Sequence, residues 1–141
     1  MKVQQDIAVF VLRIALAAGF LSAVASRLNL WGIHSSGWKN FVRYTSETNS
    51  FFPQSWASSI AVASTFAECS AGILLLIGYQ VRRAAWCSSV LTFLFAIAMS
   101  ISFGIKEPLD YSVFVFSAGA FLLSTFSDYR WTLEQLLHTN N

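Results

Sequence analysis

The chain has 141 residues, of which 55% are hydrophobic and only 11% are charged, and its mean hydropathy is +0.56. Soluble domains usually carry about 25% charged residues, so this composition predicts an integral membrane protein with one all-α domain spanning residues 1–141. The net charge of +2 and the lack of any basic run argue against a nucleic-acid-binding protein.

The first predicted membrane helix covers residues 6–26, DIAVFVLRIALAAGFLSAVAS. About 20 apolar residues at 1.5 Å each are enough to cross a hydrocarbon core of about 30 Å. Arg13 interrupts the run, and no A-x-A cleavage site precedes a polar domain. We therefore expect a retained membrane helix rather than a cleaved signal peptide.

A polar segment, residues 27–54, follows the first helix and contains one amphipathic stretch, Trp38–Thr48. Trp38, Phe41 and Val42 recur there at helical spacing, beside charged residues such as Lys39. This pattern predicts a short helix that lies in the membrane interface.

Three more membrane helices are predicted at residues 56–79, 84–105 and 109–127, which completes a four-helix bundle. The very short turn Gln80–Arg83 makes the first two of these antiparallel neighbours. Four spans place both termini on one side of the membrane. The two sides carry equal numbers of Lys and Arg, four each, but Arg82 and Arg83 lie in the tightest loop. The positive-inside rule therefore favours a cytoplasmic location for both termini on the strength of that loop alone.

Glu68 lies near the middle of the predicted helix 56–79. A charged group at that depth costs about 2.5–3.5 kcal/mol on insertion scales, so it needs a partner or a function. By rise per residue, Arg13 lies about 10 Å and Glu68 about 16 Å above the same end of their helices. We therefore expect a buried Arg13–Glu68 pair, unless Arg13 extends to the membrane surface and leaves Glu68 protonated.

This pair has two interpretations. It either stabilises the packing without a ligand, or forms a polar site that binds a small molecule or headgroup, or relays a proton. A second charged group, Lys106, Glu107 and Asp110, marks the turn between the last two predicted spans. It is either a solvated turn or, together with Arg27, the rim of a binding site.

The two cysteines, Cys69 and Cys87, are expected to be ordinary buried thiols. Their predicted depths differ by about 10 Å, which is too far for a disulfide, and there is no C-x-x-C motif. The two histidines, His34 and His138, fall on opposite membrane faces, so no metal site is predicted. No catalytic motif is present either.

Leu12-Arg13 precedes a run of small residues, and Thr65–Ala85 has a glutamate, a Gly/Leu-rich run and a basic turn in succession. In this order and spacing, these segments resemble the DoxX family of membrane proteins. Gly104–Ser124 resembles the last quarter of one bacterial branch of that family. The resemblance covers nearly the whole chain.

The resemblance implies a four-helix protein of the bacterial inner membrane. The family takes its name from small membrane subunits of a thiosulfate:quinone oxidoreductase, and other relatives accompany methylamine-utilisation or thiol-redox machinery. The positions that it carries over to this chain are Arg13, Glu68 and the run Gly72–Gly78. It implies an architecture more firmly than an activity.

The favoured hypothesis is a non-catalytic membrane subunit that docks a redox partner or presents a quinone pocket, with Glu68 and Arg13 as the polar contact. No cofactor is required, and a quinone is the candidate. One alternative is a small-molecule or lipid transporter that uses Glu68 as a protonatable site and forms a homo-oligomer. Another is a membrane chaperone or interaction module that binds through Trp38–Thr48.

Overall fold

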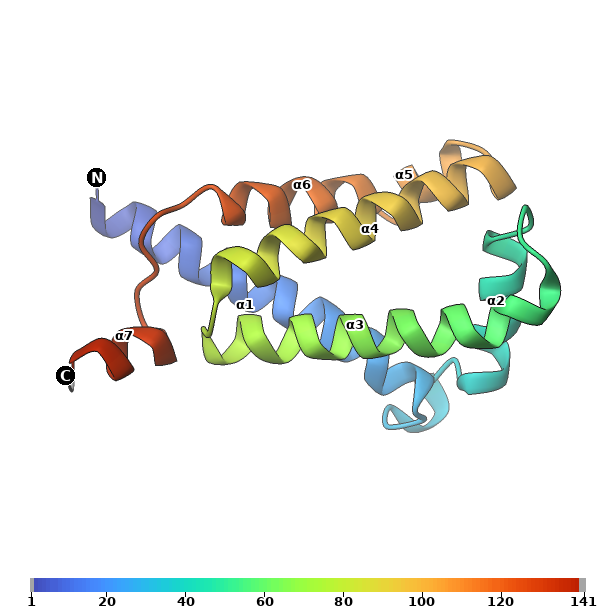
Figure 1. Cartoon of the computed structure of the whole chain (residues 1–141), viewed down its shortest axis with the longest axis horizontal. Coiled ribbons are helices and arrows are strands. Elements are labelled where there is room, and N and C mark those ends of the chain that lie inside the picture. Colours follow the sequence, from blue (N-terminus) through green and yellow to red (C-terminus); the bar gives the residue numbers. More distant parts are fainter. Residues whose placement is uncertain (1, 140–141) are drawn as a thin grey trace.

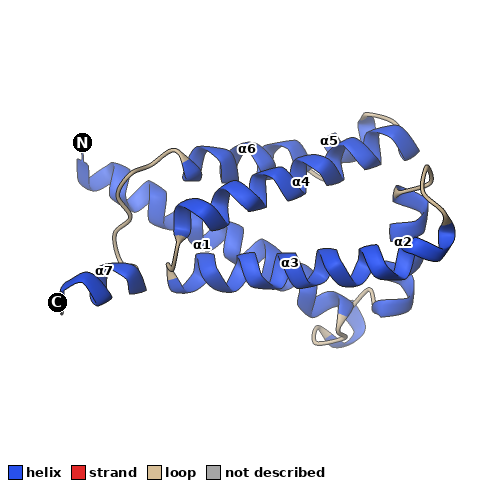
Figure 2. Cartoon of the chain, in the orientation of Figure 1, coloured by secondary structure: helices blue, strands red, loops and turns tan. Residues whose placement is uncertain are grey.

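The computed structural model describes residues 2–139, with the side chains through Leu137, and all its regular elements in that range are helices (Figures 1 and 2). The all-α prediction is confirmed. In chain order the elements are α1 (Lys2–Arg27), η1 (Gly32–His34), α2 (Trp38–Thr48), η2 (Gln54–Trp56), α3 (Ala57–Ile77), α4 (Val81–Phe103), α5 (Lys106–Asp110), α6 (Val113–Ser124) and α7 (Leu133–Thr139).

Three helical segments within the described part are long and apolar enough to cross a membrane: Lys2–Arg27, Gln54–Ile77 and Val81–Phe103. The predicted fourth span, 109–127, is not a continuous helix. Ser112 has a left-handed backbone with φ of 55°, and this residue separates α5 from α6. α6 has 12 residues, so at about 18 Å it is shorter than the hydrocarbon core. The bundle of four continuous spans is therefore not confirmed.

The long helices form two antiparallel pairs (Figure 1). α1 packs against α3, and α4 packs against α6, more extensively than any other elements do. α1 begins and α7 ends at one end of the bundle, whereas α2 lies at the opposite end. We call these two ends of the bundle the terminal end and the α2 end.

The hydrophobic core lies in the half of the bundle nearer the terminal end. It combines small and large side chains from four helices, which lets the helices approach closely. Its buried members are Val9, Leu16, Ala17, Phe20, Ala71, Leu75, Val81, Ala84, Ala85, Ala120 and Leu123. The rings of Phe20 and Phe116 meet edge to face, with their centroids 5.0 Å apart.

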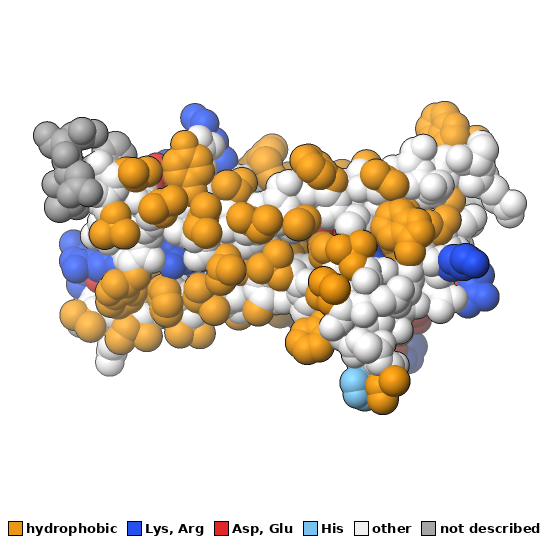
Figure 3. Space-filling model, turned by 90° about the horizontal axis from the view of Figure 1, so that it is seen from below, with side chains coloured by type: hydrophobic (Ala, Val, Ile, Leu, Met, Phe, Trp, Pro, Cys, Tyr) orange, Lys and Arg blue, Asp and Glu red, His pale blue; other side chains and the backbone are white. Residues whose placement is uncertain are grey.

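Hydrophobic side chains also cover much of the outer surface, whereas Lys and Arg gather towards its two ends (Figure 3). Phe66 on α3 is 75% exposed and Val115 on α6 is 72% exposed. Such a surface suits contact with lipid acyl chains rather than with water. Together with the three candidate spans, it identifies a multi-pass membrane protein.

The shortest connection is the turn between α3 and α4. Gly78 ends α3 with φ of 73°, and its N–H donates to the Leu74 carbonyl. α4 begins at Val81, so Arg82 and Arg83 belong to its first turn and not, as predicted, to the connecting loop. α2 has the predicted bounds, Trp38–Thr48.

Candidate functional site

A buried ion pair joins α1 to α3 near the α2 end of the bundle. Nη2 of Arg27 lies 2.8 Å from Oε2 of Glu68, and the two side chains are only 10% and 16% exposed. Nη2 also donates to Oε1 of the same carboxylate at 3.1 Å. Glu68 is thus satisfied by the last residue of α1.

The guanidinium of Arg27 has two further partners. Nη1 donates to the Thr65 hydroxyl at 3.1 Å, and Cζ lies 3.7 Å from the centroid of the Phe41 ring. Thr65 precedes Glu68 by one helical turn on α3, and Phe41 belongs to α2. Arg27 therefore ties three helices together through charge, hydrogen bonding and a cation–π contact.

The structure does not form the predicted pair between Arg13 and Glu68. The prediction assumed that the two helices begin and end at the same level. Instead, Gly78 at the end of α3 lies beside Arg13, and Gly72 lies against Phe20 and Leu21. α1 therefore extends beyond α3 at the terminal end, and this offset brings Arg27 rather than Arg13 to the level of Glu68.

Arg27 also lines a cavity of about 720 Å³ between α1, α2, α4 and the start of α6. Aromatic and methionine side chains share its wall with hydroxyl, amide and charged groups. The lining consists of Ala23, Ser26, Arg27, Ser36, Asn40, Phe41, Arg43, Tyr44, Glu47, Phe95, Met99, Tyr111 and Val113. Its size and mixed lining are typical of a small-molecule site.

Tyr44 contributes both an aromatic surface and a hydrogen-bond donor to this cavity. Its ring stacks on Phe103 with centroids 5.9 Å apart. Burial raises the pKa of the Tyr44 phenol, so its hydroxyl keeps its proton at neutral pH and can donate to a ligand oxygen. Tyr44 lies on α2, outside the candidate spans, whereas Phe95 and Met99 in the same cavity wall belong to the span Val81–Phe103.

The predicted rim does not assemble. Lys106 and Asp110 form an exposed i,i+4 ion pair on α5, and Arg27 points to Glu68 instead. The described cavity lining includes Tyr111, which follows α5, but not Lys106, Glu107 or Asp110. Lys106 and Asp110 are exposed to solvent, whereas Glu107 is half-buried on the same short helix.

The residues with potential redox or metal chemistry lie apart. Cys69 is half-buried and Cys87 is exposed, so the prediction that both thiols are buried is wrong for Cys87. His34 is exposed on η1, and the side chain of His138 lies outside the described residues. Among the residues that the structure describes, no three His, Cys, Asp or Glu side chains are grouped to bind a metal.

Arg27, the partner of Glu68, is not among the partners that the sequence predicts, because the first helix is expected to end at Ser26 and leaves Arg27 in the loop. The sequence does carry a periodic signal for it: Arg13, Phe20 and Arg27 repeat every seven residues, and all three are buried on one face of α1. Tyr44, Phe95 and Tyr111 carry no such signal, because only the fold brings them to one cavity.

Comparison with known proteins identifies one family. The family model of the methylamine utilisation protein MauE matches residues 5–127 of the chain. The predicted DoxX membership is therefore wrong, because the matching family is a different one. No curated protein matches the chain. No solved structure matches it either.

Proposed function

The chain belongs to the family of the methylamine utilisation protein MauE, and we propose that it is a non-catalytic membrane component of a redox system. The family name supports an association with methylamine utilisation. The three candidate spans support a location in a bacterial inner membrane. In this role the protein contacts the bilayer and a redox partner, and it holds a small molecule at the cavity beside Arg27.

The observation that carries the ligand proposal is the position of Arg27 in the cavity wall. Glu68 balances its charge, so an anion entering the cavity would compete with an existing carboxylate. A neutral ligand with carbonyl acceptors does not face that competition. Aromatic rings on several sides favour a flat ring, with centroid distances of 4.5–7 Å in typical pairs. A quinone has both features, and its tail can remain in lipid.

A conservative pair of variants tests the ligand proposal. Tyr44→Phe removes one donor from the cavity with almost no change in volume, whereas Tyr79→Phe makes the same change at the α3–α4 turn. We expect Tyr44→Phe to weaken binding of a short-chain ubiquinone by about 2- to 10-fold, the value of one hydrogen bond. Quenching of tryptophan fluorescence measures the affinity. Equal affinities for both variants and the parent would refute the site.

Native mass spectrometry tests the wider role. The protein is extracted in mild detergent from the membrane of its own host. A bound quinone that is retained by the parent and by Tyr79→Phe, but is less abundant on Tyr44→Phe, supports the cavity site. A second polypeptide that stays bound supports a subunit role, and a second copy of this chain indicates a homo-oligomer. A bare monomer argues against both.

We also propose that the terminal end faces the cytoplasm. Lys2, Arg82, Arg83 and Arg130 lie at that end, and Arg82 and Arg83 immediately follow the shortest turn between spans. A green fluorescent protein fused after Asn141 should therefore fluoresce, and an alkaline phosphatase fused there should be inactive. An active alkaline phosphatase with a non-fluorescent green fluorescent protein would show that the terminal end faces away from the cytoplasm.

A further inference from the structure

Arg13 is the second buried arginine of α1, and it is poorly satisfied. Its exposed fraction is 2%, yet it makes a single hydrogen bond, from Nη2 to the Trp131 carbonyl at 2.8 Å. Nε and Nη1 are buried and have no hydrogen-bond partner in the described part of the chain. A buried polar group without partners is costly, and a buried charge is more so.

Arg13 also lacks a counter-ion. It takes part in none of the ion pairs formed by residues 2–137. The acidic residue two turns earlier on the same helix face, Asp6, lies 3.0 Å from Nε of Arg130. Among the described residues, the Phe10 ring also contacts the guanidinium of Arg13, with its centroid 5.2 Å from Cζ. Arg13 therefore retains an uncompensated positive charge, unlike Arg27.

A short segment, residues 128–132, covers Arg13, and we call it the C-terminal strap. Arg130 binds Asp6, the Trp131 ring meets Phe10 edge to face at 5.4 Å, and the Trp131 carbonyl accepts from Arg13. These contacts follow one face of α1. The ion pair that secures the strap is only partly shielded, because the Arg130 side chain is 53% exposed.

The strap shows backbone strain and lies outside the matched family region. Trp131 has a left-handed backbone with φ of 55°, which is unfavourable for a bulky residue. The match to the family model ends at residue 127. Arg13 thus belongs to the matched region, whereas its cover does not.

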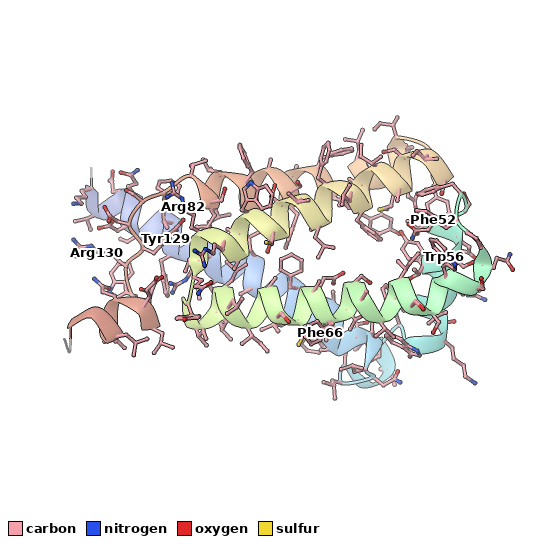
Figure 4. All side chains as sticks on the ribbon, in the orientation of Figure 1. Phe52, Trp56, Phe66, Arg82, Tyr129 and Arg130 are labelled. Atoms are coloured by element: carbon pink, nitrogen blue, oxygen red, sulfur yellow. The ribbon has the colours of Figure 1, made fainter. Side chains whose placement is uncertain are left out.

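Arg13 lies at the level where α3 ends. Gly78, which ends α3, is so close that a methyl group there would lie 2.6 Å from Nη1 of Arg13. A polar cavity of about 890 Å³ adjoins this level. Its lining carries charges of both signs: the cations Lys2, Arg82, Arg83 and Arg130 and the carboxylates Asp6, Asp128 and Glu134. Arg82, Tyr129 and Arg130 gather at this end of the bundle (Figure 4).

We propose that Arg13 is the base of an oxyanion-binding site and that the C-terminal strap is its removable cover. In the covered state the Trp131 carbonyl takes the place of one ligand oxygen. When the strap moves away, the remaining N–H groups of Arg13 bind the phosphate of an anionic lipid headgroup or of a soluble phosphate. Because the phosphate binds the open state more tightly than the covered state, its binding increases the fraction of molecules in which the strap is open.

Two variants with opposite charge changes release the strap in the full-length chain. Asp6→Asn and Arg130→Gln both break the ion pair, but one raises and the other lowers the net charge. Native mass spectrometry measures the binding of dioctanoyl phosphatidylglycerol, with dioctanoyl phosphatidylcholine and inorganic phosphate as the comparison probes. We expect both variants to bind phosphatidylglycerol about 1.5- to 5-fold more tightly than the parent, the value of one partly exposed ion pair.

Arg13→Gln is the variant that removes the site, and it should lower phosphatidylglycerol binding to the level of phosphatidylcholine. If inorganic phosphate shows the same Arg13-dependent pattern, the ligand is a soluble phosphate rather than a lipid. Opposite changes in Asp6→Asn and Arg130→Gln would indicate a net-charge effect and overturn the proposal. Unchanged binding in both variants would also overturn it.

A measurement on the parent protein does not depend on whether a variant folds. Phosphatidylglycerol should increase hydrogen–deuterium exchange at the strap amides, because binding requires the strap to move. Phosphatidylcholine should leave that exchange unchanged. Equal exchange with the two lipids would contradict the removable cover. The Tyr44→Phe variant should respond as the parent does, so this site and the quinone site can fail separately.

Discussion

Arg13 and Arg27 are both buried on the same face of α1, about four helical turns apart, but their guanidinium groups differ in how many partners surround them. Arg27 has a carboxylate, a hydroxyl and an aromatic ring around it. Arg13 has one backbone carbonyl and two unpartnered nitrogens among the described contacts. Arg27 therefore joins helices, whereas Arg13 keeps N–H groups available for a ligand from outside the bundle.

The surroundings of the two arginines explain this difference. The half that contains Arg13 is the hydrophobic core, where small side chains let four helices meet closely. The half that contains Arg27 has α2 packed across α3 and α4, with the cavity beside it. A neutral ligand suits the balanced pair at the α2 end, and an anion suits Arg13, which has no counter-ion among residues 2–137.

The largest expected effect comes from making Arg27 resemble Arg13. Glu68→Gln removes the carboxylate and leaves Arg27 buried without a counter-ion, so we expect the free energy of unfolding to fall by about 3 kcal/mol. Thermal unfolding in mild detergent, followed by circular dichroism, measures the change. Asp110→Asn removes a carboxylate from an exposed pair and should have no measurable effect.

A double variant checks that explanation. Arg27→Met with Glu68→Leu removes both charges and should recover most of the stability lost in Glu68→Gln, because apolar groups of similar volume replace a desolvated pair. If the double variant is less stable than Glu68→Gln, the loss arises from packing rather than from an unpaired charge.

The sequence predicts much of the fold because local signals suffice for it. The amphipathic helix Trp38–Thr48 and the existence of the long apolar helices follow from periodicity and length. The break at Ser112 does not, because the sequence LDYSV has neither glycine nor proline at that point. Nothing local distinguishes this stretch from a continuous helix.

The partner of Glu68 depends on a tertiary feature, the offset between α1 and α3. The sequence correctly marks Glu68 as needing a partner, and two arginines on one face of α1 are candidates. Close packing of Gly72 against Phe20 and Leu21 sets the register, and this selects Arg27. A shift of the helices by a few turns would have selected Arg13, so rise per residue alone could not decide between them.

A smaller effect is expected at Gly78, which lies between Arg13 and the strap. Gly78→Ala adds a methyl group 2.6 Å from Nη1 of Arg13 and 2.8 Å from Cα of Thr132, at a φ of 73°. We expect a loss of about 2 kcal/mol in unfolding free energy, from backbone strain and displacement of the strap. Thermal unfolding measures the loss, and hydrogen exchange at the strap should rise.

Gly32→Ala is the matched control, because Gly32 has a φ of 58° with nothing within 4 Å of the added methyl group. This substitution introduces backbone strain without a steric clash, so it should lower the free energy of unfolding by about 1 kcal/mol. Equal losses at the two glycines would show that the strap does not press on Gly78.

The smallest effect is expected at Arg13 itself, and its sign separates the two arginines. Arg13→Met removes a buried charge without a counter-ion, so in neutral detergent we expect the free energy of unfolding to rise by about 1 kcal/mol. Arg27→Met should instead lower it, because Glu68 is then left unpaired. A destabilised Arg13→Met would mean that the single hydrogen bond to Trp131 outweighs the cost of burying the guanidinium.

Added phosphatidylglycerol should make the parent more stable than Arg13→Met, because a ligand at 100 times its Kd stabilises the folded state by about 2.7 kcal/mol. This reversal cannot arise from a purely structural arginine, since a residue that only packs gains nothing from the lipid.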